Sequence, residues 1–199
     1  MITNSVEQYL SAPFKATFTE ELSPVALQRF EKLLMVRSRF YFTKIAYIKA
    51  LIKTLVKEGV YQPFSFKTVK TFKKQAYMRD GEGLYISYGI FFKTTESIFF
   101  SVLCHELAHI WLSQREFYPA LKALNKAYLS RVSDAKTGEL TSPIEVYARL
   151  FALHIIKQTA TFIQNGKRKK RAETAMRAEE EKLRKLQKMF ESIEPKTDL

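Results

Sequence analysis

The sequence predicts an α+β chain that is mostly helical, with a small mixed β-sheet packed beside one buried helix. Apolar residues recur at helical spacing in several segments, and one segment alternates apolar and polar residues as a half-buried strand does. Of the 199 residues, 46% are hydrophobic and 27% are charged. This composition is ordinary for a globular domain and excludes collagen-like and wholly disordered chains.

The N-terminal third is expected to be helical. Residues 4–11 are polar and are expected to form a short lead-in helix. Ser23 stands before a proline and an apolar stripe, so it predicts the N-cap of a helix over 24–37. A longer apolar stripe predicts a helix over 40–58, with Lys44 falling largely outside that stripe.

The sheet is expected in the middle of the chain. Residues 64–78 are rich in Phe, Val, Thr and Tyr and predict one or two strands. Residues 84–92 alternate strictly and predict the clearest strand in the chain. Thr94 or Thr95 then caps a helix that is expected to run to about residue 114, and residues 119–130 are expected to be helical.

The C-terminal third predicts a loop followed by two helices. Residues 133–141 are polar and are expected to form a loop, and a Ser-Pro pair opens a helix over 143–164. Residues 167–191 are charged, with a sparse apolar stripe, and predict an exposed or partner-seeking helix. We therefore expect one domain over 1–165 and a basic helical tail over 166–199.

Positive charge is concentrated in two segments. The chain carries 33 Lys and Arg against 20 Asp and Glu, a net charge of +13. Residues 37–74 contain ten basic residues and one acid, Glu58, and residues 167–171 are all basic. Such segments attract nucleic acid, anionic membranes or acidic proteins without choosing among them. Nucleic acid is thus a candidate partner, although no nucleic-acid motif with a readable spacing is present.

Cysteine content and hydropathy indicate the compartment. The single cysteine, Cys104, excludes an internal disulfide framework. No apolar run approaches the ~18 residues of a membrane span. The first residues lack the basic region and apolar core of a secretory signal. A cytoplasmic protein is expected.

The segment that carries chemistry reads His-Glu-Leu-Ala-His over 105–109. On a helix, His105 and His109 differ by only ~40° of rotation and ~6 Å of rise, so they can bind one Zn²⁺. Glu106 lies beside them and can accept a proton from a metal-activated water that attacks a peptide carbonyl. With 3 histidines in the chain, chance placement gives only about 0.004 expected occurrences of this pattern.

Two histidines leave a catalytic zinc site one protein ligand short. Glu145 is the favoured third ligand, because it lies in the first turn of the helix over 143–164, next to the apolar face. His154, on the same helix, and Glu116 and Asp134 stay open as alternatives. Arg115 occupies the position at which metzincins carry their third histidine, so that class is excluded.

The two motifs together resemble the small gluzincin-type zinc metallopeptidases, in particular the ImmA/IrrE family. That family carries a pattern close to E-x-x-A-N-x-F-A on its second helix, and this chain has E-x-x-A-R-x-F-A from Glu145, with Arg149 in place of the asparagine. The resemblance covers about residues 84–160 and extends to zincin-like segments of mobile elements. It implies a zincin-like fold with Glu145 as third zinc ligand, and a sheet edge that pairs an extended substrate.

These observations predict a zinc-dependent endopeptidase acting on a protein or peptide substrate. Zn²⁺ is expected on His105, His109 and Glu145, with Glu106 as general base. Arg149 is expected to pair with Glu145 or to aid a developing oxyanion. The alternative is a catalytically degenerate zincin-fold protein of a mobile element, acting as a nucleic-acid- or membrane-associated binding module. The oligomeric state stays open.

Overall fold

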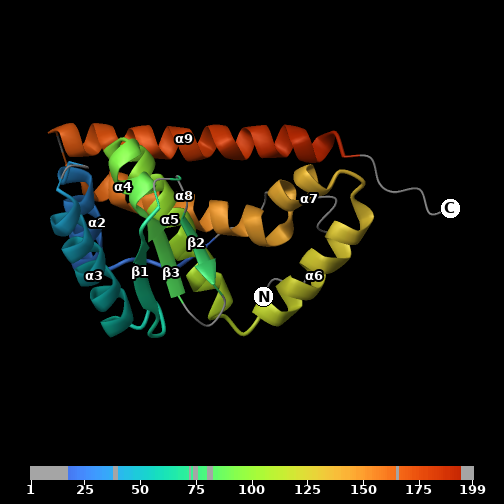
Figure 1. The fold of residues 1–199 in the computed structure, drawn as a ribbon, viewed down its shortest axis with the longest axis horizontal. Helices are drawn as coiled ribbons and strands as arrows, with labels where there is room; N and C mark the ends of the chain where they lie inside the picture. Colours follow the sequence, from blue (N-terminus) through green and yellow to red (C-terminus); the bar gives the residue numbers. More distant parts are fainter. Residues whose placement is uncertain are drawn as a thin grey trace.

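The chain is described here from a computed structural model, which shows a mostly helical α+β architecture with a small sheet (Figure 1). The residues that the structure describes are 18–37, 40–71, 73, 76–79, 83–164 and 166–193. The lead-in helix expected over 4–11 lies outside these residues.

The helices predicted over 24–37 and 40–58 are both confirmed. Helix α2 spans Pro24–Met35, and the hydroxyl of Ser23 caps it by accepting a hydrogen bond from the backbone N–H of Ala26 at 3.1 Å. Helix α3 spans Tyr41–Lys57 and packs against α2. Their apolar stripes face the core, as the periodicity predicts.

The described residues form one three-stranded sheet in the order β1-β3-β2. Strand β1 (Ser65–Val69) is parallel to the central strand β3 (Gly83–Ser87), and β2 (Ala76–Arg79) is antiparallel to it. All of β3 is buried. At Gly83, φ is +125°, and a Cβ there would collide with the backbone carbonyl oxygen of Ser65, so the strand pairing requires glycine.

The prediction of a strand over 84–92 is wrong for the second half of that segment. Strand β3 ends at Ser87, and residues Tyr88–Lys93 form the short helix α4. The hydroxyl of Ser87 caps α4 by accepting a hydrogen bond from the N–H of Ile90 at 3.4 Å. The cap overrides the alternation because a helix can bury Ile90 and Phe91 together, which a half-buried strand cannot.

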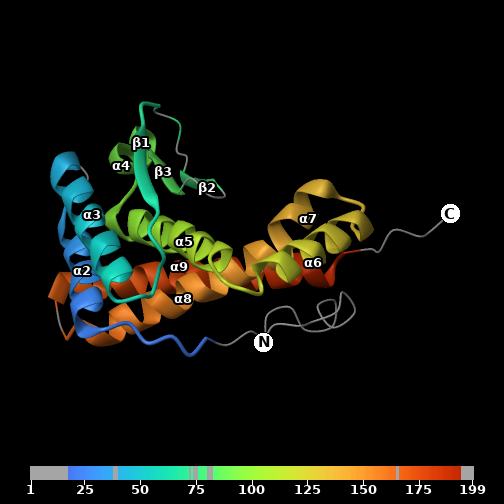
Figure 2. The same cartoon turned by 90° about the horizontal axis from the view of Figure 1, so that it is seen from below.

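Helix α5 (Glu96–Ser113) lies at the centre of the molecule. The hydroxyl of Thr95 caps it by accepting a hydrogen bond from the N–H of Ile98 at 3.4 Å, which confirms one of the two predicted caps. Figure 2 shows α5 between the sheet on one side and two long C-terminal helices on the other. A helix covered on both sides is apolar around most of its circumference, as this one is.

Lys44 corrects a prediction about α3. It was expected outside the apolar stripe, yet it has no exposed surface, and its ammonium lies 4.2 Å from the ring centroid of Phe99 in α5. The amine has no hydrogen-bond partner, and burial lowers its pKa to about 8. The ring of Phe99 covers a flank of α3 that the periodicity of α3 alone does not reveal.

Helix α6 (Tyr118–Arg131) confirms a prediction, and helix α7 (Ala135–Thr141) corrects one. Residues 133–141 were expected to form a loop. Asp134 instead caps α7, its carboxylate accepting a hydrogen bond from the N–H of Thr137 at 3.0 Å. A polar segment can thus be helical when its first residue supplies the cap.

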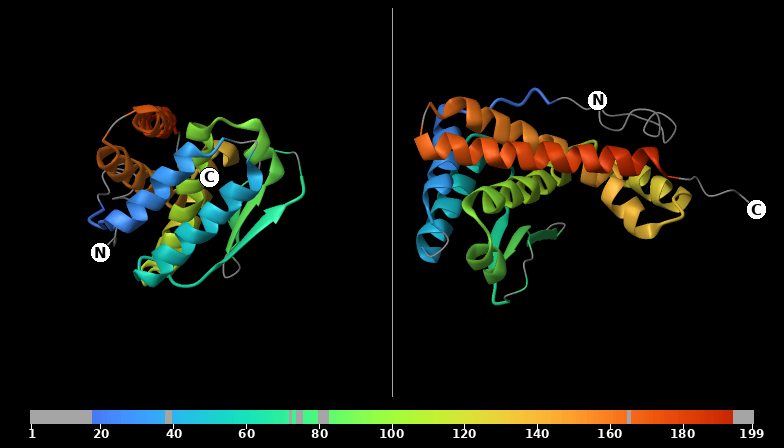
Figure 3. Two further views of the ribbon diagram at one scale, coloured as in Figure 1. Left: turned by 90° about the vertical axis from the view of Figure 1, so that its left-hand side faces the viewer. Right: turned by 90° about the horizontal axis from the view of Figure 1, so that it is seen from above.

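Helix α8 (Pro143–Phe162) begins at the predicted Ser-Pro pair. Helix α9 (Gly166–Glu191) follows it and was expected to be exposed or to seek a partner. It packs instead against both α5 and α8, and Figure 3 shows it extending over them. The side chains buried on its inner face are Ala172, Ala175, Glu179, Leu183 and Leu186.

The basic run over 167–171 opens α9 and makes contacts within the chain. Arg168 forms an ion pair with Glu31 of α2 at 2.7 Å. Arg171 donates a hydrogen bond to the backbone carbonyl of Leu34. Two of the basic side chains are therefore used to fasten α9 to α2, and the nucleic-acid partner expected for this run stays a prediction.

Helices α2, α3, α5, α8 and the start of α9 share one hydrophobic core with the sheet. Helix α6 adds Leu121 to this core from its first turn, while the rest of α6 and helix α7 lie to one side, beneath the far part of α9 (Figure 1). No helix over the described residues combines the length and the hydropathy that crossing a bilayer requires.

Candidate metal centre

Helix α5 positions both histidines of the His-Glu-x-x-His segment on one face. The Nε2 atoms of His105 and His109 lie 3.1 Å apart. Their side chains are 12% and 16% exposed, so an ion or a water molecule can reach them from solvent. The Nδ1 atom of His105 is buried and has no hydrogen-bond partner, and its Nε2 atom faces the second histidine.

Glu145 reaches the two imidazoles from the first turn of α8. One carboxylate oxygen lies 3.4 Å from Nε2 of His105, and the other lies 3.3 Å from Nε2 of His109. The packing of α5 against α8 brings the two segments together across about 40 residues of sequence. The residue expected as third ligand therefore lies where a third ligand is needed.

The donor set fits a zinc ion in type and spacing. Zinc prefers imidazole nitrogen and carboxylate oxygen at about 2.0–2.2 Å, so neighbouring ligands in a tetrahedron are separated by about 3.3–3.6 Å. The separations of 3.1, 3.3 and 3.4 Å are close to this range. Among the residues that the structure describes, no other group of three or more His, Cys, Asp or Glu side chains converges in this way.

Glu106 lies beside the triad and is 7% exposed. Burial raises the pKa of its carboxyl above the ordinary value, while the neighbouring imidazoles of His105 and His109 act to lower it. Glu145 shows the opposite balance. Burial would raise the pKa of Glu145, but the imidazoles and Arg149 outweigh it and hold that pKa well below the ordinary value. The two carboxyl groups therefore differ in how readily they take a proton.

Arg149 forms an ion pair with Glu145, the candidate third ligand. This was one of the two roles expected for Arg149. Its Nη2 lies 2.7 Å from Oε1 of Glu145, one helical turn away, and its Nη1 lies 3.3 Å from Oε2 of Glu179 in α9. Both ends of the guanidinium are thus engaged by carboxylates. This arrangement favours the ion-pair role over direct contact with a developing oxyanion.

Glu179 is a residue of this cluster that the sequence patterns did not predict. Its carboxylate is fully buried and also accepts hydrogen bonds from the hydroxyl of Ser101 and, at 2.6 Å, from the ammonium of Lys182. Burial would raise the pKa of Glu179, but Lys182, Ser101 and Arg149 outweigh it and lower that pKa.

A signal for Glu179 exists in the sequence of α9. Its buried positions follow one another at intervals of three or four residues, the spacing of a helix face that packs against other helices. They are Ala172, Ala175, Glu179, Leu183 and Leu186. A glutamate at a position of this kind is expected to meet a buried partner, but the two alanines are too small to make the stripe conspicuous.

The other candidate ligands lie apart from the triad. His154 has its Nε2 atom 2.7 Å from the backbone carbonyl oxygen of Glu20, and Asp134 caps α7. Glu116 is exposed in the turn after α5. Cys104 is buried as expected, and burial raises the pKa of its thiol, so it is not poised as a thiolate ligand.

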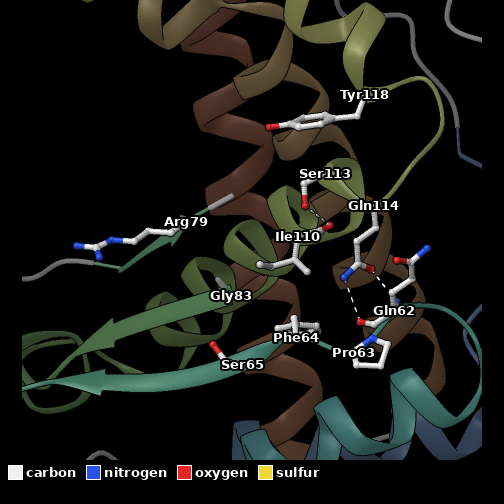
Figure 4. Close-up of a pocket in the computed structure, with 10 residues that line it drawn as sticks. All are labelled: Gln62, Pro63, Phe64, Ser65, Arg79, Gly83, Ile110, Ser113, Gln114 and Tyr118. Atoms are coloured by element: carbon white, nitrogen blue, oxygen red, sulfur yellow. Dashed lines mark hydrogen bonds between the residues drawn. The ribbon is translucent and has the colours of Figure 1, made fainter. Parts of the chain in front are cut away.

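A cavity of about 760 Å³ opens at the C-terminal end of α5, one turn beyond His109 (Figure 4). The side chain of Gln114 forms two hydrogen bonds with the backbone of Gln62 at the edge of the cavity. It accepts one from the N–H at 2.8 Å and donates one to the carbonyl oxygen at 3.0 Å. The lining residues are Gln62, Pro63, Phe64, Ser65, Arg79, Gly83, Ile110, Ser113, Gln114 and Tyr118.

Comparison with known proteins does not assign a family to these features. No protein-family model, no curated protein and no solved structure matches the chain.

Proposed function

We propose that this chain is a zinc-dependent endopeptidase with a zincin-like fold. One observation carries the proposal: His105 and His109 from α5 and Glu145 from α8 converge at separations of 3.1–3.4 Å, with Glu106 buried beside them. Two imidazoles and one carboxylate are the ligand set of the thermolysin type of catalytic zinc site, which leaves one position for water or substrate.

Bound zinc would supply a water of lowered pKa and would polarise a peptide carbonyl. Glu106 is the group that would take the proton from that water at its carboxylate and later deliver it to the leaving amine nitrogen. Its place next to His105 in sequence keeps its carboxyl near the site, where it interacts electrostatically with both imidazoles. Glu145, held ionised by Arg149 and the imidazoles, would stay a ligand throughout.

The cavity at the end of α5 supports a peptide as substrate. Its volume of about 760 Å³ is large enough for several residues of an extended chain. Its lining combines apolar side chains such as Phe64 and Ile110 with hydroxyl and amide groups such as Ser113. Such a lining can bury side chains of a peptide and still pair with its backbone.

The test combines metal analysis with one isosteric substitution. The purified full-length protein is expected to bind zinc in a 1:1 ratio and to cleave an unstructured protein or a peptide library. Glu106→Gln should keep the zinc and lose cleavage by about 10²–10⁴-fold, the range for a lost general base. Glu116→Gln, on the exposed turn after the same helix, is the control and should cleave like the wild type.

Removal of zinc with a chelator should abolish cleavage, and added zinc should restore it. A wild-type protein that binds no zinc would overturn the proposal, as would a Glu106→Gln variant that cleaves as fast as the wild type. Salt-sensitive binding of nucleic acid by an inactive wild type would instead favour the binding-module alternative.

A further inference from the structure

Glu179 is a buried carboxylate in the middle of α9, on a helix that supplies no candidate ligand. Its side chain is 0% exposed. A charge in such a position is expensive unless it is paired and hydrogen-bonded. Replacing it and its partners with apolar residues of similar volume would often be neutral or stabilising, so overall stability alone does not account for it.

Glu179 contacts the helix that carries both histidines. Oε1 of Glu179 accepts a hydrogen bond from the hydroxyl of Ser101, which is itself 1% exposed. Ser101 lies four residues before His105, so its side chain is on the same side of α5, one turn away. The ammonium of Lys182 also donates to this oxygen at 2.6 Å.

Glu179 also contacts the helix that carries the third candidate ligand. Oε2 of Glu179 lies 3.3 Å from Nη1 of Arg149, whose Nη2 lies 2.7 Å from Oε1 of Glu145. The carboxylate of Glu179 thus bridges α5 and α8. The residue that it contacts on each helix, Ser101 or Arg149, lies one turn from a candidate ligand. Figure 3 shows α9 lying over both helices.

Charge balance gives this bridge a consequence for a bound cation. The guanidinium of Arg149 lies against one of the oxygens that face the imidazoles, so its positive charge opposes a dication at that position. An anion on the far side of the guanidinium offsets that charge. Glu179 is that anion, and it and Arg149 are 0% and 15% exposed, so solvent screens their pair weakly. Its other partner, Lys182, is 44% exposed, so water screens the opposing charge of that ammonium more strongly.

We propose that Glu179 is a positioning residue of the metal centre, which holds Arg149 against Glu145 and neutralises its charge so that a divalent cation can bind. This inference rests on the zinc site of the proposed function. It makes α9 part of that site. It also predicts that metal affinity, and not only folding, depends on a residue that touches no ligand directly.

The experiment measures zinc affinity by competition with a chromophoric chelator, on the full chain. Glu179→Gln keeps the shape and removes the charge, and we expect zinc affinity to fall about 10–100-fold, the range for outer-shell partners of metal sites. Glu180→Gln is the matched control, because Glu180 is the next residue of α9 and pairs with Lys157 of α8 at 3.2 Å, away from the site. It should bind zinc like the wild type.

Two further variants separate charge balance from packing. Glu179→Asp keeps the charge, and we expect its zinc affinity to stay within about threefold of the wild type. The double variant Arg149→Gln/Glu179→Gln removes both charges, and we expect it to recover most of the affinity that Glu179→Gln loses. Thermal unfolding of the metal-free proteins identifies any variant that does not fold. Should Glu179→Gln be one, Glu179→Asp and the double variant, compared with the wild type, still test the inference.

The outcomes are distinguishable from failure of the proposed function. A wild type without zinc affinity overturns both. If the wild type binds zinc, then a folded Glu179→Gln variant of equal affinity overturns the inference alone. A tenfold loss in Glu179→Asp, or a double variant as weak as Glu179→Gln, shows that packing rather than charge matters and also overturns it.

Discussion

Each half of α8 carries a cluster of polar side chains that includes or contacts a histidine. The two clusters differ in the groups with which their polar atoms pair. In the C-terminal half, Nε2 of His154 lies 2.7 Å from the carbonyl oxygen of Glu20, and Gln158 bonds both Glu20 and the N–H of Leu22. In the N-terminal half, Glu145 contacts side chains, namely the imidazoles of α5 and the guanidinium of Arg149.

The difference separates a structural cluster from a candidate site. Backbone groups of the segment before α2 engage His154 and Gln158, so this cluster fastens that segment to α8. Two imidazole nitrogens and two carboxylate oxygens face one another at Glu145, and Arg149 pairs with one of these four atoms, so a cation or a proton among them is favourable. The side chains of both clusters are half-buried, so the type of partner is the distinguishing property.

The largest expected effect comes from removing the charge of the candidate ligand. Glu145→Gln should lower zinc affinity by at least about 100-fold, because a lost ligand exceeds the effect of a lost outer-shell partner. His154→Gln, from the other half of α8, should stay within about threefold of the wild type. Competition with a chelator measures both. Equal losses of zinc affinity in Glu145→Gln and His154→Gln would contradict the assignment of the metal site to the N-terminal half of α8.

Zinc should stabilise the fold only through the N-terminal half. At a free zinc concentration 100 times the Kd, the wild type and His154→Gln should each gain about 2.7 kcal/mol in the free energy of unfolding. His109→Ala should gain almost nothing, because it lacks one of the donors. Urea unfolding with zinc and with a chelator gives the difference. A gain in His109→Ala equal to that of the wild type would place the bound ion elsewhere.

His154→Ala should affect stability and leave the site intact. Loss of the contact with the carbonyl of Glu20 is expected to cost about 1 kcal/mol in the free energy of unfolding, since Gln158 still donates to that carbonyl at 2.8 Å. Zinc affinity should not change. Chemical denaturation and zinc titration of one preparation provide both numbers, and a large fall in affinity would mean that the two halves are coupled.

The smallest effect concerns acid sensitivity next to the site. The lowered pKa of Glu179 means that its contribution to stability is complete above the carboxyl pKa of the unfolded chain, about 4.3, and is lost as the pH falls through the lower folded pKa. Metal-free Glu179→Gln should therefore lose less stability than the wild type between about pH 5 and about pH 2. Parallel curves for the wild type and Glu179→Gln would contradict the prediction.

The sequence predicted most helices because their caps and stripes are local. Ser23 and Thr95 mark helix starts where the structure has them. Helices α4 and α7 were missed because Ser87 and Asp134, which cap them, stand in segments whose pattern favoured a strand and a loop. Lys44 was misplaced because its burial comes from Phe99 in another helix, which no pattern within α3 reports.

The candidate site was predictable where spacing within one helix sets the geometry. His105 and His109 follow from a four-residue interval, and Arg149 meets Glu145 for the same reason. Convergence of Glu145 on the imidazoles needs the packing of α8 on α5, which the place of Glu145 beside the apolar face of its helix favoured and the resemblance also implied. Glu179 needed a third helix, and the mixed charge of α9 indicated exposure rather than a buried carboxylate.

Ribosomes deliver the chain from its N-terminus, so Glu179 emerges 30 residues after Arg149. A nascent chain therefore exposes its imidazoles and the Glu145 carboxylate before α9 exists to fold over α5 and α8. During that interval the guanidinium of Arg149 lacks its buried anion, so the proposed role of Glu179 predicts weaker metal binding. Under the proposed function, the order of translation would thus delay zinc binding, and with it peptidase activity, until α9 is complete.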